Sequence, residues 1–237
     1  MNTETKPSIR GISSMATRQL LAELGAAFEQ RSGCAVAIEA VGGVDAAKRV
    51  AAGEAFDVVV LSADAIDKLI AAGHLQAGSR VEVVRSSVGI AVRAGAPTPD
   101  VSSEDALKDA VRTARSIGYS TGPSGTALLA LFDRWGMGDE LRGRLQQARP
   151  GVPVGTLVAQ GEVELGFQQL SELIHVDGIT VLGVMPAELA FDTYFSAGLP
   201  IGLAGDSEKA AHVRALLDHM TSPDAAAAKR RQGMEPA

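Results

Sequence analysis

Small and hydroxyl-bearing residues follow three expected strands, where each strand passes into a helix. Ser13-Ser14 follows an apolar stretch at 9–12, Gly42-Gly43-Val44 follows 36–41, and Ser62-Ala63-Asp64 follows 56–61. Such junctions offer hydroxyls, backbone N–H groups and the positive end of a helix dipole to an anion. Because the carboxyl ends of strands in an open α/β sheet lie together, these loops are expected to converge. The candidate ligand residues are Ser13, Ser14, Gly43, Val44 and Ser62, with helix capping as the alternative.

A second group of polar residues lies in the middle of the chain. The segment 119–126 (Tyr-Ser-Thr-Gly-Pro-Ser-Gly-Thr) runs from an expected strand into a helix, and it places Ser124, Gly125 and Thr126 near exposed backbone donors. It lacks the lysine and the spacing of a nucleotide P-loop. Adjacent glutamines, Gln168 and Gln169, stand at another strand end and can donate amide hydrogen bonds to an oxygen-rich ligand. The alternative for the glutamines is a solvated turn.

Arg85 stands inside an otherwise apolar run at 83–92. A planar guanidinium there can bind a carboxylate through two parallel hydrogen bonds. An exposed arginine on an edge strand is the alternative.

Composition excludes several classes of protein. The 237 residues are 46% hydrophobic and 4% aromatic, and the formal net charge is −6. Neither the charge nor the aromatic content suits nucleic-acid binding. The one basic run, 229–231, is expected to be a solvated tail. The single cysteine, Cys34, excludes an internal disulfide and a cysteine-based zinc cluster, and a small buried residue is expected there. Neither a cofactor nor a metal is expected.

Strand and helix patterns alternate along the chain, which predicts α/β architecture with parallel sheets covered by helices on both faces. Two β-rich runs, 83–92 and 194–203, bracket a central block. If both are connections, 1–88 plus 194–237 form lobe one and 89–193 form lobe two. Two Rossmann-like lobes joined by two crossing strands predict a ligand cleft, with hinges at 87–94 and 191–198.

These motifs, taken in order, resemble a known family. The set Ser13-Ser14, Gly42-Gly43, the segment 56–64 (Phe-Asp-Val-Val-Val-Leu-Ser-Ala-Asp), Pro123-Ser124-Gly125 and the segment 162–166 (Glu-Val-Glu-Leu-Gly) resembles the molybdate-binding branch of the type II periplasmic binding proteins. The resemblance implies ligand contacts at Ser13, Val44, Ser124-Gly125 and around Gln168. It also implies an ABC transporter permease as a partner.

The chain departs from that branch at two places. Gly43-Val44 stands where molybdate binders typically offer a serine, and Gln168-Gln169 stands near the place of a tyrosine. These departures, together with Arg85, favour an organic acid over a tetrahedral oxyanion. The segments Arg85-Ser86-Ser87 and 166–173 (Gly-Phe-Gln-Gln-Leu-Ser-Glu-Leu) are similar to a subgroup that includes aconitate isomerases.

Three functions fit this sequence. The first is a solute-binding protein that captures a small anion, either an organic di- or tricarboxylate or a molybdate-like oxyanion. The second is an isomerase that moves a proton across an allylic tricarboxylate, for which Glu172 and His175 are the nearest candidate bases. No acid–base pair stands out, so binding is favoured. The third is a cytoplasmic effector sensor.

The expected setting follows from the same residues. Residues 1–7 are polar and lack the apolar core of a secretory leader, which places the chain in the cytoplasm, or in the periplasm if a leader has been removed. A monomer is expected, with no membrane insertion and no nucleic-acid partner.

Arg85→Lys separates carboxylate recognition from oxyanion recognition. For an organic acid, lysine keeps the charge but loses the two-bond fork, and affinity should fall about ten- to a hundredfold. For a molybdate-like ligand, Ser13→Ala or Ser124→Ala should matter more. Calorimetry on the three variants, with folding checked first, makes the comparison, and wild-type carboxylate affinity in Arg85→Lys rules out the role of this arginine.

Overall fold

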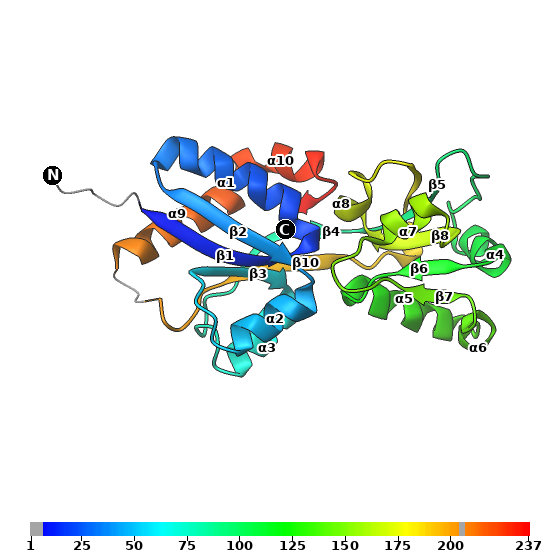
Figure 1. The fold of residues 1–237 in the computed structure, drawn as a ribbon, viewed down its shortest axis with the longest axis horizontal. Coiled ribbons are helices and arrows are strands. Elements are labelled where there is room, and N and C mark those ends of the chain that lie inside the picture. The colour runs from blue at the N-terminus through cyan, green and yellow to red at the C-terminus, as the bar shows by residue number, and fades with distance from the viewer. Residues whose placement is uncertain (1–6, 204–206) are drawn as a thin grey trace. The chain divides into compact units, whose positions relative to one another are not determined.

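The computed structural model of the protein describes residues 7–203 and 207–237. The expectation of a leaderless N-terminus rests on 1–7, of which only Pro7 falls within these ranges. The described chain divides into two compact units, each a sheet with helices (Figure 1). Unit one is Met1–Arg85 with Tyr194–Ala237, and unit two is Ser86–Thr193. The predicted fold class, two Rossmann-like α/β lobes joined by two crossings of the chain, is confirmed.

Unit one contains a six-stranded sheet in the order β11-β4-β10-β3-β1-β2. Its elements are β1 (Ser8–Ser14), α1 (Arg18–Ser32), β2 (Ala35–Val41), α2 (Gly43–Ala51), β3 (Val58–Ser62), α3 (Ala63–Ala71), β4 (Val81–Ser86), β10 (Thr193–Gly198), α9 (Glu208–Thr221), α10 (Ala226–Arg231) and β11 (Glu235–Pro236).

Unit two contains a five-stranded sheet in the order β7-β6-β8-β5-β9. Its elements are β5 (Val88–Arg93), α4 (Glu104–Thr113), β6 (Ile117–Tyr119), α5 (Pro123–Arg134), α6 (Gly138–Leu141), β7 (Leu145–Gln147), α7 (Val154–Gln160), β8 (Leu165–Gln169), α8 (Leu170–Leu173) and β9 (Ile179–Val184).

Both sheets are mixed: strands of the repeated strand–helix units are parallel, as expected, and antiparallel strands are added to them. In unit one, β1 pairs in parallel with β2 and β3, whereas β10 runs antiparallel to β3. In unit two, β6 is parallel to β7 and β8, and β5 is antiparallel to β8 and β9. The antiparallel strands β5 and β10 are those that follow the two crossings, where no crossover helix fixes a parallel direction.

Each sheet buries apolar side chains on both faces. In unit one, Ile9 packs in the core under α1, α9 and α10, and Ile12 packs in the core under α2 and α3 (Figure 1). Odd-numbered and even-numbered residues of β1 therefore face opposite sides of the sheet. Cys34 is fully buried in the first of these cores, as predicted.

Two glycines allow α7 to approach the sheet of unit two closely. Gly118 of β6 and Gly166 of β8 are register partners. A β-carbon on Gly118 would lie 2.9 Å from the Val154 side chain, and one on Gly166 would lie 2.5 Å from that of Val158. Because only glycine leaves this space, the pair sets how near the start of α7 lies to the ends of β6 and β8.

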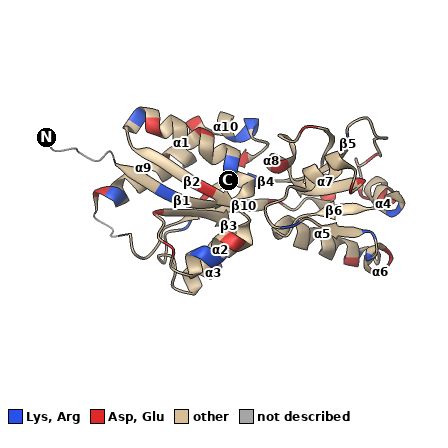
Figure 2. Ribbon diagram, in the orientation of Figure 1, with Lys and Arg blue, Asp and Glu red and all other residues tan. Residues whose placement is uncertain are grey.

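Charged residues of both signs are interspersed on the helices (Figure 2), as α2 shows with Asp45, Lys48 and Arg49. Strands β6 and β8 carry no charge.

The basic run near the C-terminus is only partly solvated. Arg230 and Arg231 are exposed and pair with Glu235 and Glu23. Lys229, however, is only 2% exposed, so the expectation of a solvated tail was wrong for this residue. Its neighbours Ala228 and Met234 belong to the core, which draws the lysine inward with them. Burial lowers the pKa of Lys229.

Lys229→Met should therefore stabilise the protein, by about 1–3 kcal/mol at pH 7, because it removes a charge that is costly to bury. The gain should shrink as the pH rises toward the unfolded lysine pKa of about 10.4, since deprotonation then relieves the wild-type protein. Urea unfolding across this pH range measures it. The matched control is Arg230→Met, which should change stability by less than about 0.5 kcal/mol; equal effects of both variants would contradict the assignment.

Candidate functional site

Two serine hydroxyls are buried without a partner at the carboxyl end of β1. Ser13 is 0% exposed and Ser14 is 7% exposed. Among the residues that the structure describes, neither hydroxyl oxygen has a hydrogen-bond partner. The sequence placed both serines in a loop, but they are the last two residues of the strand, because β1 pairs with β2 through Ser14. Ser14 makes no side-chain cap bond to the 3-10 turn that follows, so capping does not account for it.

The neighbouring strand ends bring the rest of the first group to the same edge. Helix α2 begins at Gly43, and a β-carbon there would lie 3.6 Å from the Ser14 β-carbon. Gly43 and Val44 were expected in a turn, but they form the first turn of this helix. Val44 is 51% exposed. Ser62 is half-buried, ends β3 and makes no side-chain cap bond to α3.

Arg85 stands apart from these residues. It is half-buried near the end of β4, opposite Glu235 of β11. In the sheet order, β10 and β3 lie between β4 and β1, which separates Arg85 from Ser13 by about 14 Å at the usual strand spacing. The structure does not bring this guanidinium beside the serine pair.

In unit two, the segment 119–126 forms a tight turn into α5. The hydroxyls of Ser120 and Ser124 lie 2.9 Å apart, and Ser124 is buried. A β-carbon on Gly125 would lie 1.9 Å from the Ser120 carbonyl oxygen, so glycine is required there. Gly125 is buried in the first turn of α5, where backbone N–H groups begin the helix, whereas Thr126 is exposed.

The paired glutamines end β8 and are both 3% exposed. The alternative of a solvated turn was therefore wrong. The Oε1 atom of Gln168 accepts a hydrogen bond from the Val154 N–H at 2.7 Å, and its Nε2 donates to Glu172 at 2.8 Å. Gln169 donates from Nε2 to Thr193 Oγ1 at 2.7 Å, and its buried Oε1 has no partner in the described chain.

The sequence did not predict the burial of the Ser86 and Ser196 hydroxyls or the role of the Val154 backbone N–H. Ser86 at the end of β4 and Ser196 within β10 are buried, with hydroxyls that lack partners within 7–203 and 207–237. Ser196 interrupts an apolar strand, which was the available signal. The backbone N–H of Val154 left no trace in the sequence, because its role depends on the close packing of α7.

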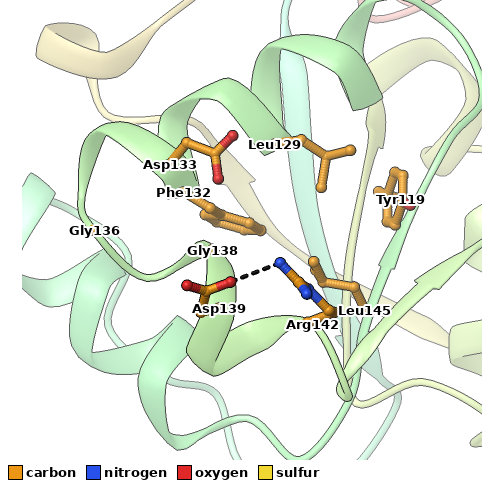
Figure 3. A pocket seen from close by; sticks show the side chains of 9 residues that line it. All are labelled: Tyr119, Leu129, Phe132, Asp133, Gly136, Gly138, Asp139, Arg142 and Leu145. Atoms are coloured by element: carbon orange, nitrogen blue, oxygen red, sulfur yellow. Dashed lines mark hydrogen bonds and ion pairs between the residues drawn. The ribbon is translucent and has the colours of Figure 1, made fainter.

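A hollow of about 480 Å³ lies beside α5 and α6 (Figure 3). Tyr119, Leu129, Phe132 and Leu145 contribute the larger apolar lining side chains, and the charged residues are Asp133, Asp139 and Arg142. Arg142 already pairs with Asp139 at 2.6 Å in an exposed ion pair. Two carboxylates with one engaged guanidinium make this hollow a poor place for an anion.

Within the described residues, no group of three or more His, Cys, Asp or Glu side chains is arranged to hold a metal ion. No helix in the described ranges is both long and apolar enough to span a membrane.

Known structures share this fold. The periplasmic molybdate-binding protein of Azotobacter vinelandii matches with a TM-score of 0.76 at 21% identity, covering 95% of this chain and 98% of that one. The tungstate ABC transporter protein of Geobacter sulfurreducens matches with a TM-score of 0.70 at 19% identity, covering 93% and 97%. The fold is thus that of the type II periplasmic binding proteins, as the motifs predicted.

The family follows from sequence. Residues 9–235 match the model of the bacterial extracellular solute-binding protein family. An aconitate isomerase from Pseudomonas sp is 36% identical over 231 residues, which cover 95% of this chain and 86% of that enzyme. The chain belongs to the bacterial extracellular solute-binding protein family.

Gly125→Ala should damage the turn into α5. Its β-carbon cannot share space with the Ser120 carbonyl, so the backbone must shift, at a cost of about 1–3 kcal/mol or more. Urea unfolding measures the loss. Gly143→Ala is the matched control, because a β-carbon there meets nothing within 4 Å and its φ is not positive. Equal stability of the two variants would show that the turn adapts freely.

Proposed function

We propose that this chain captures a small polycarboxylate anion. The observation that carries the proposal is the pair of buried, unpartnered hydroxyls at Ser13 and Ser14. A buried polar group without a partner costs about 1–3 kcal/mol, so a fold that retains two at adjacent residues has a use for them. The adjacent first turn of α2, at Gly43 and Val44, supplies backbone N–H groups suited to an anion.

Two features favour carboxylates over a tetrahedral oxyanion. The first N–H of α7, at Val154, already donates to Gln168 and is therefore engaged within the protein. At the start of α2, the exposed side chain of Val44 is apolar and offers no hydroxyl. A compact oxyanion accepts hydrogen bonds on all sides, and both features leave fewer donors available for it. Ser124 and Ser120 are the donors proposed for unit two. The Gly125 N–H already donates to the Gly122 carbonyl at 3.1 Å, so Gly125 has weaker support, as have Arg85, Ser62, Thr126 and Gln169.

A second candidate function is isomerisation of an unsaturated tricarboxylate. It is favoured by the 36% identity to an aconitate isomerase over nearly the whole chain. Both candidate functions require binding of the same class of ligand, so the proposal of binding does not depend on isomerisation. A periplasmic location and an ABC transporter permease as partner belong to the binding proposal, supported by what the two structural relatives are.

Ser13→Ala tests the proposed function. Removing an unsatisfied buried hydroxyl should raise the free energy of unfolding of the ligand-free protein by about 1 kcal/mol, and it should weaken binding of trans-aconitate or citrate roughly tenfold. Urea unfolding measures the free energy of unfolding, and calorimetry measures the affinity. Wild-type affinity in the variant would remove Ser13 from the site.

Ser103→Ala is the control with the opposite expectation. The Ser103 hydroxyl caps α4 by accepting from the Ala106 N–H at 3.3 Å. Its loss should destabilise the protein by about 1 kcal/mol and leave affinity unchanged. If the wild-type protein binds neither tricarboxylate, the proposal fails as a whole.

A further inference from the structure

The amide of Gln168 has a single orientation. The Val154 backbone N–H can only donate, so the atom that faces it at 2.7 Å must be the glutamine oxygen. The Nε2 group therefore faces Glu172 and donates to its Oε1 at 2.8 Å. With Gln168 only 3% exposed, this amide acts as a rigid link between the start of α7 and the Glu172 carboxylate.

Glu172 lies just beyond the carboxyl end of β8, at the same end of the sheet as the donors proposed for unit two. It is a half-buried residue of α8, which begins directly after β8. Strands β6 and β8 are parallel, with Tyr119 opposite Phe167, so the Ser120–Ser124 pair and Gln168 follow at the same edge. Helix α8 also packs on the start of α7, where a β-carbon on Gly155 would lie 3.3 Å from the Leu173 side chain.

A carboxylate is a costly neighbour for an anionic ligand. A protein that only captures a polycarboxylate gains affinity by keeping like charges out of its site. Here a half-buried glutamate is instead held in place by a buried glutamine that is itself held by a backbone N–H. The hydrogen bond fixes Oε1, and a carboxylate is a suitable acceptor for a proton taken from carbon next to a carboxylate.

We propose that Glu172 is the proton-transfer residue of an allylic isomerisation and that Gln168 is its positioning residue. This inference rests on the proposed recognition of a tricarboxylate and extends it to the reaction.

The step balances without any further reactant. The Glu172 carboxylate takes a proton from the CH₂ carbon of the ligand, so that a C–H bond breaks and an O–H bond forms. The freed electron pair makes a new C=C bond to the central carbon, and the original π pair moves to the far carbon, where its carboxylate stabilises the charge. Glu172 then returns the proton to that far carbon. The double bond has moved, and nothing has been oxidised or reduced.

The test uses trans-aconitate and the full chain. Calorimetry measures binding, and proton NMR in D₂O measures both isomerisation and deuterium entry at the CH₂ carbon. Glu172→Gln should bind within about threefold of wild type and lose exchange by about 10²–10⁴-fold, the usual range for general base catalysis. Gln168→Met should lower kcat with little change in KM, because the ligand contacts remain. Glu162→Gln, an exposed glutamate of the same unit, is the matched control and should behave as wild type.

The outcomes are distinguishable. Exchange at the wild-type rate in Glu172→Gln overturns the proposal, and so does a wild-type protein that binds trans-aconitate without exchange. A wild-type protein that does not bind removes the proposed function and this inference with it. If Glu172→Gln fails to fold, Glu172→Asp decides: folded and binding with slowed exchange supports the proposal, and unchanged exchange overturns it.

Discussion

The need of every buried polar group for a hydrogen-bond partner is the constraint on which this structure depends most visibly. In most of the chain that need is met by the sheets and helices themselves. At the end of β1 it is not met, because the hydroxyls of Ser13 and Ser14 are buried without a partner among the described residues. At the end of β8, Gln168 uses both atoms of its amide, whereas the buried Oε1 of Gln169 has no partner in the same described ranges. The carboxyl ends of β1 and β8 thus differ: Ser13 and Ser14 at the first have hydroxyls without partners in the described chain, and Gln168 at the second holds the Glu172 carboxylate in a fixed place.

The hydrogen bond between Val154 and Gln168 in unit two depends on two glycines, which have no side chain. Gly118 and Gly166 leave room for α7 to lie directly on the sheet, and this closeness brings the Val154 N–H to Gln168. A larger residue at either glycine would lift the start of the helix and separate that contact. The position of Glu172 is therefore set in part by two glycines that act through the packing of one helix.

Much of this could be predicted from sequence, and the remainder has a common cause. Alternating strand and helix patterns predicted the fold class, and the ordered serine and glycine motifs predicted the family. Strand ends were less accurate, because pairing with a neighbour extends β1 through Ser13 and Ser14. Lys229 was placed in solvent, and a solvated turn stood as the alternative for Gln168, because burial of a polar residue is decided by its tertiary surroundings, which no local pattern encodes.

The thiol of Cys34 can be used to measure local opening of unit one. Cys34 is the only cysteine of the chain and has no solvent exposure, at the point where α1 ends and β2 is about to begin. A thiol reagent therefore finds nothing to modify in the native state and one group to modify once this part of unit one opens. The rate of labelling follows the opening of the core that α1, α9 and α10 cover, without an introduced probe. Any cysteine later placed on the surface would be distinguished from it by reactivity, so site-directed labels need no prior removal of the native thiol.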